Sequence, residues 1–453
     1  MKFDTIKDEL LALADTGVKY AKDKGADQAE IYISSNNQMT LQNQSGMINA
    51  RNGLNEGVGI RVSLDNKLGF AAMSGLTDES IKNAITEALT VARNVQQENE
   101  GFESFATKNQ SGKDGIIDDD IITLSTEDAV KYANTVFLEA KDFDKRVIAP
   151  SAHLQTFYGG YAIANSEGVS SASKYTAFVL YSTVTAAENG KRKSAYQIEV
   201  QRAIPKIAGI GKKAAEKAVD LLTSKPLDYN GKLPTLWNPT IMSNYWQMAF
   251  IHSINGRQVV EKNSYFMDKL GDKVGIDDLT IVDDGQLKEG INTNAIDEEG
   301  VPRSSTPIIE DGVLRSFLYD TYYGRLGKAE STGNASRSSG YESTPNISPT
   351  TLVVQKGDKT FDELVTNIDK GIYIMDNVMG LGHSNLISGD FSIVATSSYL
   401  IEDGEIKHPL ESLTIAGNLY KSLKNIQAMG SDIELFQSVK TPSVVFEGFT
   451  VNG

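Results

Sequence analysis

The first half of the chain contains consecutive segments in which apolar and polar residues alternate, and a helical pattern follows them. The alternating segments are residues 29–34, 39–49, 57–63 and 67–73, with a hairpin expected across Leu64, Asp65 and Asn66. Alternation with a period of two indicates strands that bury one face. The helix that follows starts near Thr77, Glu79 and Ser80 and carries an apolar stripe on Ile81, Ile85, Ala88, Leu89 and Ala92. This region is therefore restricted to a sheet closed by a helix.

A similar order of elements recurs further along the chain. Residues 151–158, 159–165, 169–184 and 193–202 are predicted strands, after a helix over 126–140 and before a helix over 207–222. The recurrence indicates a weak internal duplication, supported by the order of elements and not by residue identity. Residues 96–120 are polar and rich in Glu, Asp, Lys and Gly, so we expect an exposed loop or tether between the two units.

From residue 227 the sequence favours β structure. Predicted strands cover residues 279–283, 306–310, 313–319, 351–354, 391–401 and 443–447, and Asp-Gly turns at 284–285, 311–312 and 403–404 punctuate them. Two helices interrupt them, one over residues 250–258 and one over 360–369, where Thr360 and Glu363 suit a capping box. We expect an α+β fold with an N-terminal α/β half of two related strand-helix units and a C-terminal, mainly-β barrel or sandwich domain. The expected boundaries are 1–95, 96–120, 121–226 and 227–453.

Charge and composition exclude several classes of partner. The net charge of −15 argues against general attraction to nucleic acid or to an anionic membrane. No apolar run approaches the roughly 18 residues that span a bilayer, and Lys7, Asp8 and Glu9 give the N-terminus an amphipathic helix instead of a secretory signal. The absence of cysteine excludes disulfides and thiolate metal ligands. We expect a cytoplasmic protein.

Residues 250–258 read FIHSINGRQ, which has the shape of a zinc-peptidase helix with most of its chemistry replaced. A hydrolytic zinc site needs about three protein ligands and a carboxylate that accepts a proton from the bound water. His252 remains, but Ser253 stands where the general-base glutamate would be and Arg257 where the second histidine would be. Guanidinium offers no lone pair to a cation, and an unassisted hydroxyl is a poor base. Taken alone, His252 is best interpreted as a packed or hydrogen-bonded helical histidine.

Ordered blocks downstream give the chain a family resemblance. They are residues 297–302 (DEEGVP), 308–314 (IIEDGVL), 318–320 (LYD), 331–335 (STGNA), 388–392 (SGDFS), 401–405 (IEDGE), Pro409, 414–419 (TIAGNL) and 430–432 (GSD). In this order they resemble the TldD/TldE (PmbA) peptidase family, once described as modulators of DNA gyrase. In that family the TldD-type subunit carries an HExxxH helix and a downstream cysteine for zinc, and the TldE/PmbA-type subunit lacks them.

The resemblance implies that this chain is the metal-free type. It would hold no cofactor and would be a catalytically incomplete subunit of a heterodimeric, ATP-independent protease, with zinc in the TldD-like partner. The expected substrates are unfolded or extended peptides, which the complex would degrade or trim, and a homodimer is possible in isolation. Two other functions stay open: a peptidase with a rearranged metal site, and a peptide-binding module without hydrolysis.

Two glycine-containing segments are candidate substrate-binding residues. Thr332, Gly333 and Asn334 form one, and Ser388, Gly389 and Asp390 form the other. Small residues allow a peptide main chain to approach closely and to pair with an exposed strand. The alternative for each glycine is a demanding turn beneath the barrel.

Other polar residues have weaker claims to a site. His252, His383 and Asp390 could form a rearranged metal site, although such a site also needs a new general base. The acids at 297–299 could hold a hard cation, but the pattern is more typical of a solvated turn, and the acids at 283–284 of an Asx turn. His153 is expected to be a surface or packing residue and His408 stands before Pro409. A serine hydrolase built on Ser253 and His252 is excluded because adjacent helical residues point about 100° apart.

Overall fold

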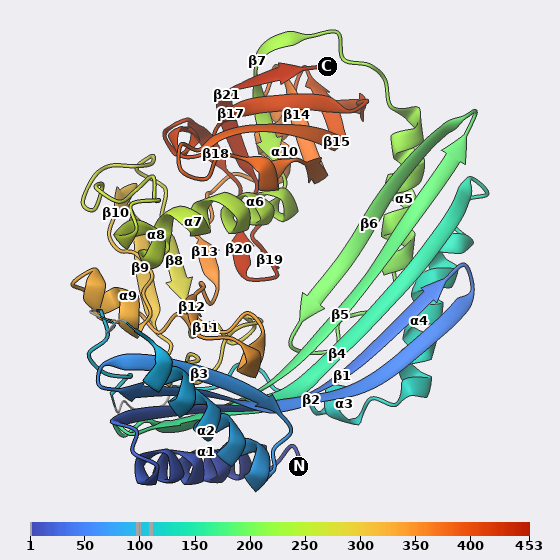
Figure 1. Cartoon of the computed structure of the whole chain (residues 1–453). Helices are drawn as coiled ribbons and strands as arrows, with labels where there is room; N and C mark the ends of the chain where they lie inside the picture. The colour runs from blue at the N-terminus through green and yellow to red at the C-terminus, as the bar shows by residue number, and fades with distance from the viewer. Residues whose placement is uncertain (1, 97–98, 100, 108–111) are drawn as a thin grey trace.

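A six-stranded antiparallel sheet forms the N-terminal half of the computed structural model, which describes all residues except 1, 97–98, 100 and 108–111 (Figure 1). Its strands are β1 (Gln28–Gln44), β2 (Met47–Leu64), β3 (Lys67–Ser74), β4 (Val147–Asn165), β5 (Ser170–Glu188) and β6 (Lys191–Gln201). Their order in the sheet is β3-β2-β1-β4-β5-β6. The pairing of β1 with β4 therefore joins the two predicted units into one sheet.

Helices cover one face of this sheet, and the C-terminal half lies toward the other (Figure 1). The helices are α1 (Ile6–Asp23), α2 (Asp78–Asn94), α3 (Asp119–Thr123), α4 (Thr126–Lys141) and α5 (Ile210–Asp220). On β1, Ile31 and Ile33 pack against α1 and α2, whereas Tyr32 packs on the opposite face against Tyr161 and Ile296. Each unit has the order helix, three strands, helix, which confirms the predicted duplication.

Two predicted strand boundaries in this sheet are wrong. The segment 39–49 is not one strand, because Ser45 and Gly46 have positive φ angles of 53° and 87° and turn the chain from β1 into β2. Conversely, residues 151–158 and 159–165 belong to one strand. Gly159 stays in the ladder opposite Asn36, where the backbone of Ser35 leaves no room for a Cβ.

The segment 96–120 was expected to be exposed, and its described part is only partly so. Phe102, Phe105 and Ala106 are buried, and the segment ends in α3. Residues 97–98, 100 and 108–111, which the same prediction covered, lie outside the described residues. Burial of two aromatic rings fixes this connection against the body of the molecule.

The C-terminal half contains a closed five-stranded barrel, so the predicted α+β fold with a barrel or sandwich domain is confirmed as a barrel. Its strands are β7 (Asn230–Trp237), β14 (Lys370–Met379), β15 (Asp390–Glu402), β17 (Leu413–Asn418) and β21 (Val444–Asn452). They follow the order β14-β7-β21-β17-β15, and pairing of β14 with β15 closes the ring. β16 (Glu405–Pro409) extends β15, and β18 (Ile426–Met429) pairs with β21.

A second six-stranded sheet lies next to the barrel in the order β10-β9-β8-β13-β20-β19. Its strands are β8 (Ile281–Asp284), β9 (Ser305–Glu310), β10 (Val313–Leu314), β13 (Leu352–Val354), β19 (Glu434–Phe436) and β20 (Val439–Thr441), and β11 (Ala335–Ser336) pairs separately with β12 (Asn346–Ile347). The predicted strand over 313–319 stops at Leu314, because Leu318 pairs instead with Asn255. Helix α9 (Thr321–Leu326) follows it, and α10 (Phe361–Thr366) has the predicted capping box of Thr360 and Glu363.

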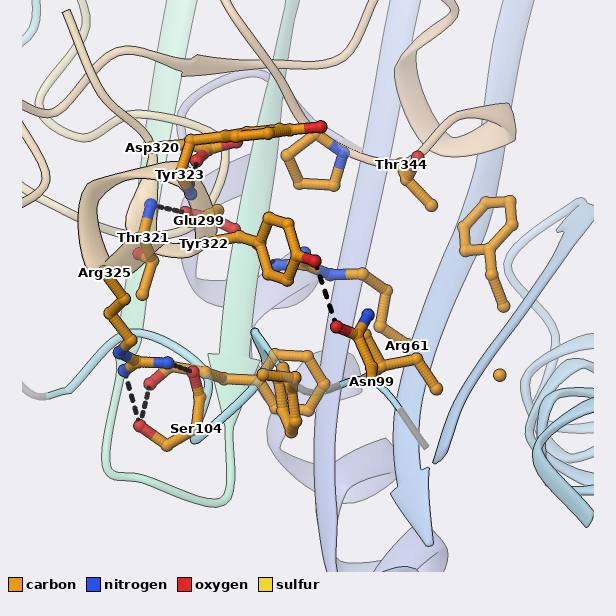
Figure 2. Close-up of a pocket in the computed structure, with 16 residues that line it drawn as sticks. Arg61, Asn99, Ser104, Glu299, Asp320, Thr321, Tyr322, Tyr323, Arg325 and Thr344 are labelled. Atoms are coloured by element: carbon orange, nitrogen blue, oxygen red, sulfur yellow. Dashed lines mark hydrogen bonds and ion pairs between the residues drawn. The ribbon is translucent and has the colours of Figure 1, made fainter. Parts of the chain in front are cut away.

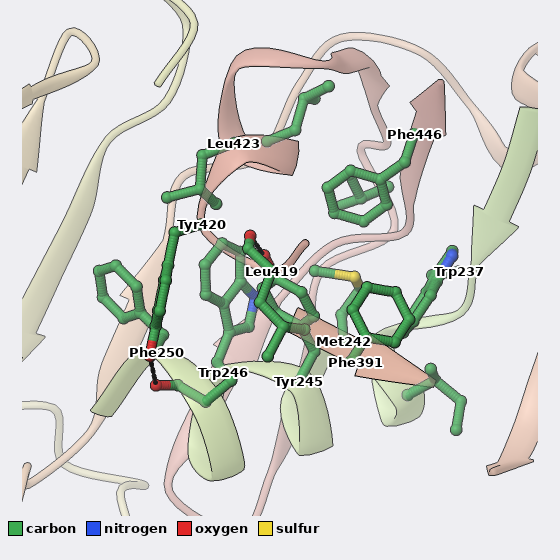
Figure 3. Close-up of a cluster of buried hydrophobic side chains, with 14 of the residues drawn as sticks. Trp237, Met242, Tyr245, Trp246, Phe250, Phe391, Leu419, Tyr420, Leu423 and Phe446 are labelled. Carbon is green, nitrogen blue, oxygen red and sulfur yellow. Dashed lines mark hydrogen bonds between the residues drawn. The ribbon is translucent and has the colours of Figure 1, made fainter. Parts of the chain in front are cut away.

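A large aromatic cluster joins the barrel to the helical segment that precedes residue 251 (Figure 3). The ring centroid of Trp237 lies 5.8 Å from those of Phe446 and Phe449. Trp246 and Tyr245 meet edge to face at 4.9 Å. The segment that carries the altered zinc motif is therefore fixed to the barrel at its N-terminal end. Among the described residues, no helix has both the length and the apolar character needed to cross a membrane.

Candidate functional site

The segment that resembles a zinc-peptidase helix is broken, so the prediction of one continuous helix over 250–258 is wrong. It consists of α6 (Pro239–Tyr245), a π-helical turn (Trp246–Phe250), α7 (Ile251–Ile254) and α8 (Gly256–Val260). Asn255 between α7 and α8 has extended φ and ψ angles of −75° and 120°. His252 and Arg257 consequently lie on different helices, and their spacing does not place them on one helical face.

Contacts with the segment before α9 explain the break. The side chain of Asn255 caps α8 by accepting a hydrogen bond from the Arg257 N–H at 3.0 Å. The N–H of Gly256 donates to the Leu318 carbonyl at 2.8 Å instead of to a helical partner. A Cβ on Gly256 would overlap the ring of Tyr319. Packing against residues 318–319, which the local sequence does not reveal, therefore ends α7.

His252 and Arg257 each have a structural partner, whereas the buried hydroxyl of Ser253 has no hydrogen-bond partner among the described residues. His252 Nε2 lies 3.1 Å from the Asn263 carbonyl, which confirms the interpretation of a hydrogen-bonded histidine. Ser253 is fully buried. Arg257 bonds Glu261 Oε1 at 2.9 Å, and its guanidinium lies 5.8 Å from the ring centre of Tyr323. None of these arrangements presents a general base to a metal-bound water.

The alternative metal set of His252, His383 and Asp390 is not assembled. Within the described part of the chain, no three His, Asp or Glu side chains are grouped in a way that could hold a metal ion. His383 is exposed in a short 3-10 turn, and Asp390 begins β15. His153 stacks on Tyr181 at 4.5 Å, and burial lowers its pKa, as expected of a packing residue.

The first predicted substrate segment, residues 332–334, is held by hydrogen bonds within the segment and to Asp283. Asn334 is buried and donates to Asp283 Oδ2 at 2.6 Å, while Thr332 Oγ1 donates to Asn334 Oδ1 at the same distance. Gly333 has a φ of 75°, and a Cβ there would lie 2.5 Å from the Pro302 carbonyl oxygen. These residues form a turn between Tyr319 and the second sheet, and their contact with a peptide stays a prediction.

The second predicted segment is more accessible. Asp390 is exposed, and Asp390 Oδ2 accepts from the Ser388 hydroxyl at 2.9 Å. Asn418 on β17 donates to Asp390 Oδ1 at 2.8 Å and so fixes the loop to the barrel rim. Gly389 has a φ of 84° against the ring of Tyr420. No described contact links this segment to the first one, so the two predicted segments do not form one site in the single chain.

Asp297 and Glu299 of the acidic run at 297–299 are buried and Glu298 is half-buried, so the prediction of a solvated turn is wrong. Asp297 closes the turn from inside, because its Oδ1 accepts the N–H groups of Glu299 and Val301 at 2.9 Å and its Oδ2 accepts that of Ala335 at 3.0 Å. Glu299 is only 2% exposed. The N-terminal sheet packs on this turn, a contact that no local pattern indicates. Likewise, Asp284 forms the predicted Asx turn with Gln286, whereas Asp283 is buried.

Ion pairs connect this turn to the N-terminal sheet. Arg61 on β2 bonds both carboxylate oxygens of Glu30 on β1, at 2.8 and 2.6 Å, and also Glu299 Oε1 at 2.9 Å. Arg337 bonds Glu30 Oε1 from the other side at 2.8 Å. Burial alone would raise the pKa of Glu299, but Arg61 and the bonds from Thr321 outweigh it, so the pKa is lowered. Glu30 and Glu299 are therefore compensated charges.

A cavity of about 320 Å³ lies beside these ion pairs, between the N-terminal sheet, Asn99, residues 102–105 and α9 (Figure 2). Phe70, Phe102, Phe105 and Tyr322 supply aromatic walls, and Arg61, Glu299, Asp320 and Arg325 supply charges. Asn99 Oδ1 accepts from the Tyr322 hydroxyl at 3.0 Å, and Arg325 bonds Ser104 Oγ at 2.7 Å. Its size lies at the lower end of the range for small-ligand pockets.

Asp320 differs from the other acids around the cavity. It is 3% exposed, and its Oδ1 accepts the N–H of Tyr323 at 2.7 Å. Among the described residues no cation lies within ion-pair distance of its carboxylate. Burial, and then repulsion from Glu299, raises the pKa of Asp320 to about 7, and the same two causes raise that of Asp297 to about 7.

Sequence reasoning missed Arg61, Asp320 and the cavity that they line. One signal was available for Arg61, since it interrupts an apolar stretch of β2 between Ile60 and Val62. Glu299 and Asp320 lay in two of the blocks that carried the family resemblance. Their proximity to Arg61 depends on how the C-terminal half packs on the sheet, which a single sequence does not specify.

Comparisons with known proteins agree with the sequence blocks. Profiles described as PmbA/TldA metallopeptidase domain 1, central domain and C-terminal domain match residues 29–92, 119–222 and 230–453. Metalloprotease PmbA of Escherichia coli O157:H7 is 26% identical over 450 residues, or 97% of this chain and 95% of the relative. A metalloprotease TldD homolog of Haemophilus influenzae is 25% identical over 429 residues, or 91% and 87% of the two chains.

The fold of this chain is also found in a solved structure. The crystal structure of TldE from Thermococcus kodakarensis has a TM-score of 0.88 with this structure at 21% identity, covering 97% of this chain and all of the other. The three domain profiles follow one another in order and cover most of the chain. This protein therefore belongs to the PmbA/TldD metallopeptidase family.

Proposed function

We propose that this chain is the non-catalytic subunit of a heterodimeric metallopeptidase, and that a TldD-like partner holds the zinc ion. The observation that carries the proposal is the chemistry of the motif positions. Ser253 and Arg257 replace a base and a metal ligand, Arg257 is on a separate helix from His252, and the chain has no cysteine. The residues present do not fit a hydrolytic zinc ion, which needs lone-pair donors that converge on one point.

The role left for this chain is to shape the substrate path and to contact an extended peptide. The loop 388–390 supports this role, since its polar groups are accessible at the rim of the barrel. Backbone pairing to a strand recognises the conformation of a peptide more than its sequence, which suits unfolded substrates. The first segment, 332–334, would act indirectly by fixing the residues that precede α9. We further propose that the complex works in the cytoplasm.

Purification of this chain alone, of its candidate partner alone and of the mixture tests the proposal. Zinc content and cleavage of an unfolded peptide are measured for each. We expect zinc in the partner, cleavage by the mixture, and neither in this chain. A mixture that contains the His252→Ala variant should keep both its zinc and its activity, because His252 is bonded to the Asn263 carbonyl and not to a metal.

Other outcomes would contradict the proposal in distinct ways. Stoichiometric zinc and chelator-sensitive cleavage by this chain alone would favour a rearranged metal site. A chain that binds peptides but never associates with an HExxxH-bearing partner would favour a binding module, alone or as a homodimer. Inactivation of the mixture by His252→Ala, with assembly retained, would also assign this chain a direct part in catalysis.

A further inference from the structure

We propose that the cavity lined by Asp320 binds an aliphatic cation, either the basic side chain of a peptide or a free alkylammonium ion. The proposal concerns binding by this chain alone and does not depend on a partner or on hydrolysis. It rests on one buried carboxylate without a described counter-ion and on the walls around it (Figure 2).

Of the two acidic side chains that line the cavity, Glu299 is paired with Arg61, whereas Asp320 has no ion-pair partner among the described residues. Arg61 is committed to Glu30 and Glu299 through bonds of 2.6 to 2.9 Å. Glu299 accepts from Arg61 and, through Oε2, from the Thr321 N–H at 2.9 Å. Asp320 has the Tyr323 N–H as its described donor. Burying a carboxylate without a cation is costly, and a bound cation would remove that cost.

An anionic ligand fits this cavity poorly. The second guanidinium of its lining, Arg325, is bonded to the carbonyl and hydroxyl oxygens of Ser104 and lies 3.9 Å from Glu103. Neither guanidinium group of the lining is therefore free to pair with a carboxylate or a phosphate. The pKa of Asp320 is raised because burial and Glu299 disfavour its charged form more than the Tyr323 N–H and the charge of Arg61 favour it, and a cation in the cavity would favour it further.

The aromatic walls fit the stem and the charge of an aliphatic cation. Phe70, Phe102 and Tyr322 line the cavity together with the carboxylate. Aromatic faces attract ammonium groups, and their apolar surface covers methylene groups. A volume of about 320 Å³ accommodates a side chain or a small amine but not a folded segment.

Calorimetric titration of the full-length chain at pH 8 and low salt tests the proposal. The ligands are N-acetyl-lysine methylamide, its uncharged counterpart N-acetyl-norleucine methylamide, and n-butylammonium. We expect the lysine compound to bind at least 10-fold more tightly than the norleucine compound. Tighter binding of the lysine compound than of n-butylammonium would identify a peptide side chain as the source of the cation, and the reverse order would identify a free amine.

Asp320→Asn is the informative variant, because an amide oxygen can still cap α9 by accepting from the Tyr323 N–H. We expect at least a 10-fold loss of affinity for the lysine compound. Asp118→Asn is the matched control, since Asp118 caps α3 in the same way but does not line the cavity. Its affinity should equal that of the unmodified chain.

Several results would overturn the proposal. They are equal binding of the lysine and norleucine compounds, no binding of either cation, and equal affinities for Asp320→Asn and Asp118→Asn. The first two are measured on the unmodified chain, so they hold even if a variant fails to fold. None of them bears on assembly with a zinc-containing partner, so failure here and failure of the proposed function are distinguishable.

Discussion

The phenol oxygen of Tyr323 lies 3.0 Å from Oε1 of Glu261, and this bond joins α9 to the end of α8. Glu261 also bonds Arg257, whose guanidinium faces the Tyr323 ring. Tyr323 in turn lines the cavity that contains Asp320. Helix α8 is thus linked to the cavity through the side chain of Tyr323.

Restoring the zinc motif should not restore a zinc site. Ser253→Glu combined with Arg257→His supplies the two residues missing from the helix motif, but the break at Asn255 keeps the two histidines on separate helices. Ser253 is also fully buried, so an unpaired glutamate there should lower the free energy of unfolding by several kcal/mol. Metal analysis and thermal unfolding measure the two effects.

Arg257→His alone is the control for that experiment. Its side chain is 46% exposed, so a change of roughly 0.5 kcal/mol or less is expected. A folded double variant with one tightly bound zinc ion per chain would show that the break in the helix is not the obstacle.

Stability should depend on pH through Asp320. Its folded pKa of about 7 exceeds the unfolded value near 3.9, so the folded chain holds more protons between these values. The stability that this group contributes is fully present below about pH 4 and is lost as the pH rises to about 7. Relative to the unmodified chain, Asp320→Asn should therefore gain up to about 4 kcal/mol between pH 4 and pH 8. Denaturant unfolding across this range measures the difference, and a gap that stays constant with pH would contradict the assignment.

Removal of the Arg61 guanidinium should lower the free energy of unfolding far more than removal of a surface charge. Arg61→Met leaves Glu299 without a cation and Glu30 with Arg337 alone, which should cost about 3–5 kcal/mol. The matched control is Lys131→Met, which removes exposed ion pairs on α4 and should leave stability nearly unchanged. Adding Glu299→Gln to Arg61→Met should recover part of the loss. Similar unfolding midpoints for the Arg61 and Lys131 variants would show that the buried pairs contribute little.

Gly333 should tolerate alanine less well than another glycine of similar conformation. Both Gly333 and Gly25 have positive φ angles, 75° and 93°, so each alanine carries a backbone cost of about 1 kcal/mol. At Gly25 a Cβ would meet nothing within 4 Å, whereas at Gly333 it would press on Pro302. Gly333→Ala should therefore lower the free energy of unfolding by about 1–3 kcal/mol more than Gly25→Ala. Equal melting temperatures for the two variants would mean that the turn at residues 332–334 shifts enough to accommodate the added Cβ.

Sequence patterns predicted many of the helices and strands because these elements depend on residues that are close in the sequence. Helix α2 starts after Thr77 as expected, and all five residues of the predicted stripe are buried, together with Ala84. The break at Asn255 escaped prediction because its cause is Leu318, more than 60 positions away. The ion pair of Arg61 with Glu299 joins residues 238 positions apart. Only tertiary packing brings such residues together, so the motif was recognised from the sequence while the cavity beside it was not.

The pairing of β1 with β4 shows how the two units of the N-terminal sheet are related in space. Equivalent strands of the two units meet there in antiparallel register, from Glu30 opposite Asn165 to Gln44 opposite Ser151. Each side of this pairing thus presents the same strand to its counterpart, which is the geometry of an isologous contact between identical subunits. The strand order β3-β2-β1-β4-β5-β6 is therefore the one that two copies of a single three-stranded unit would give if they paired through their first strands.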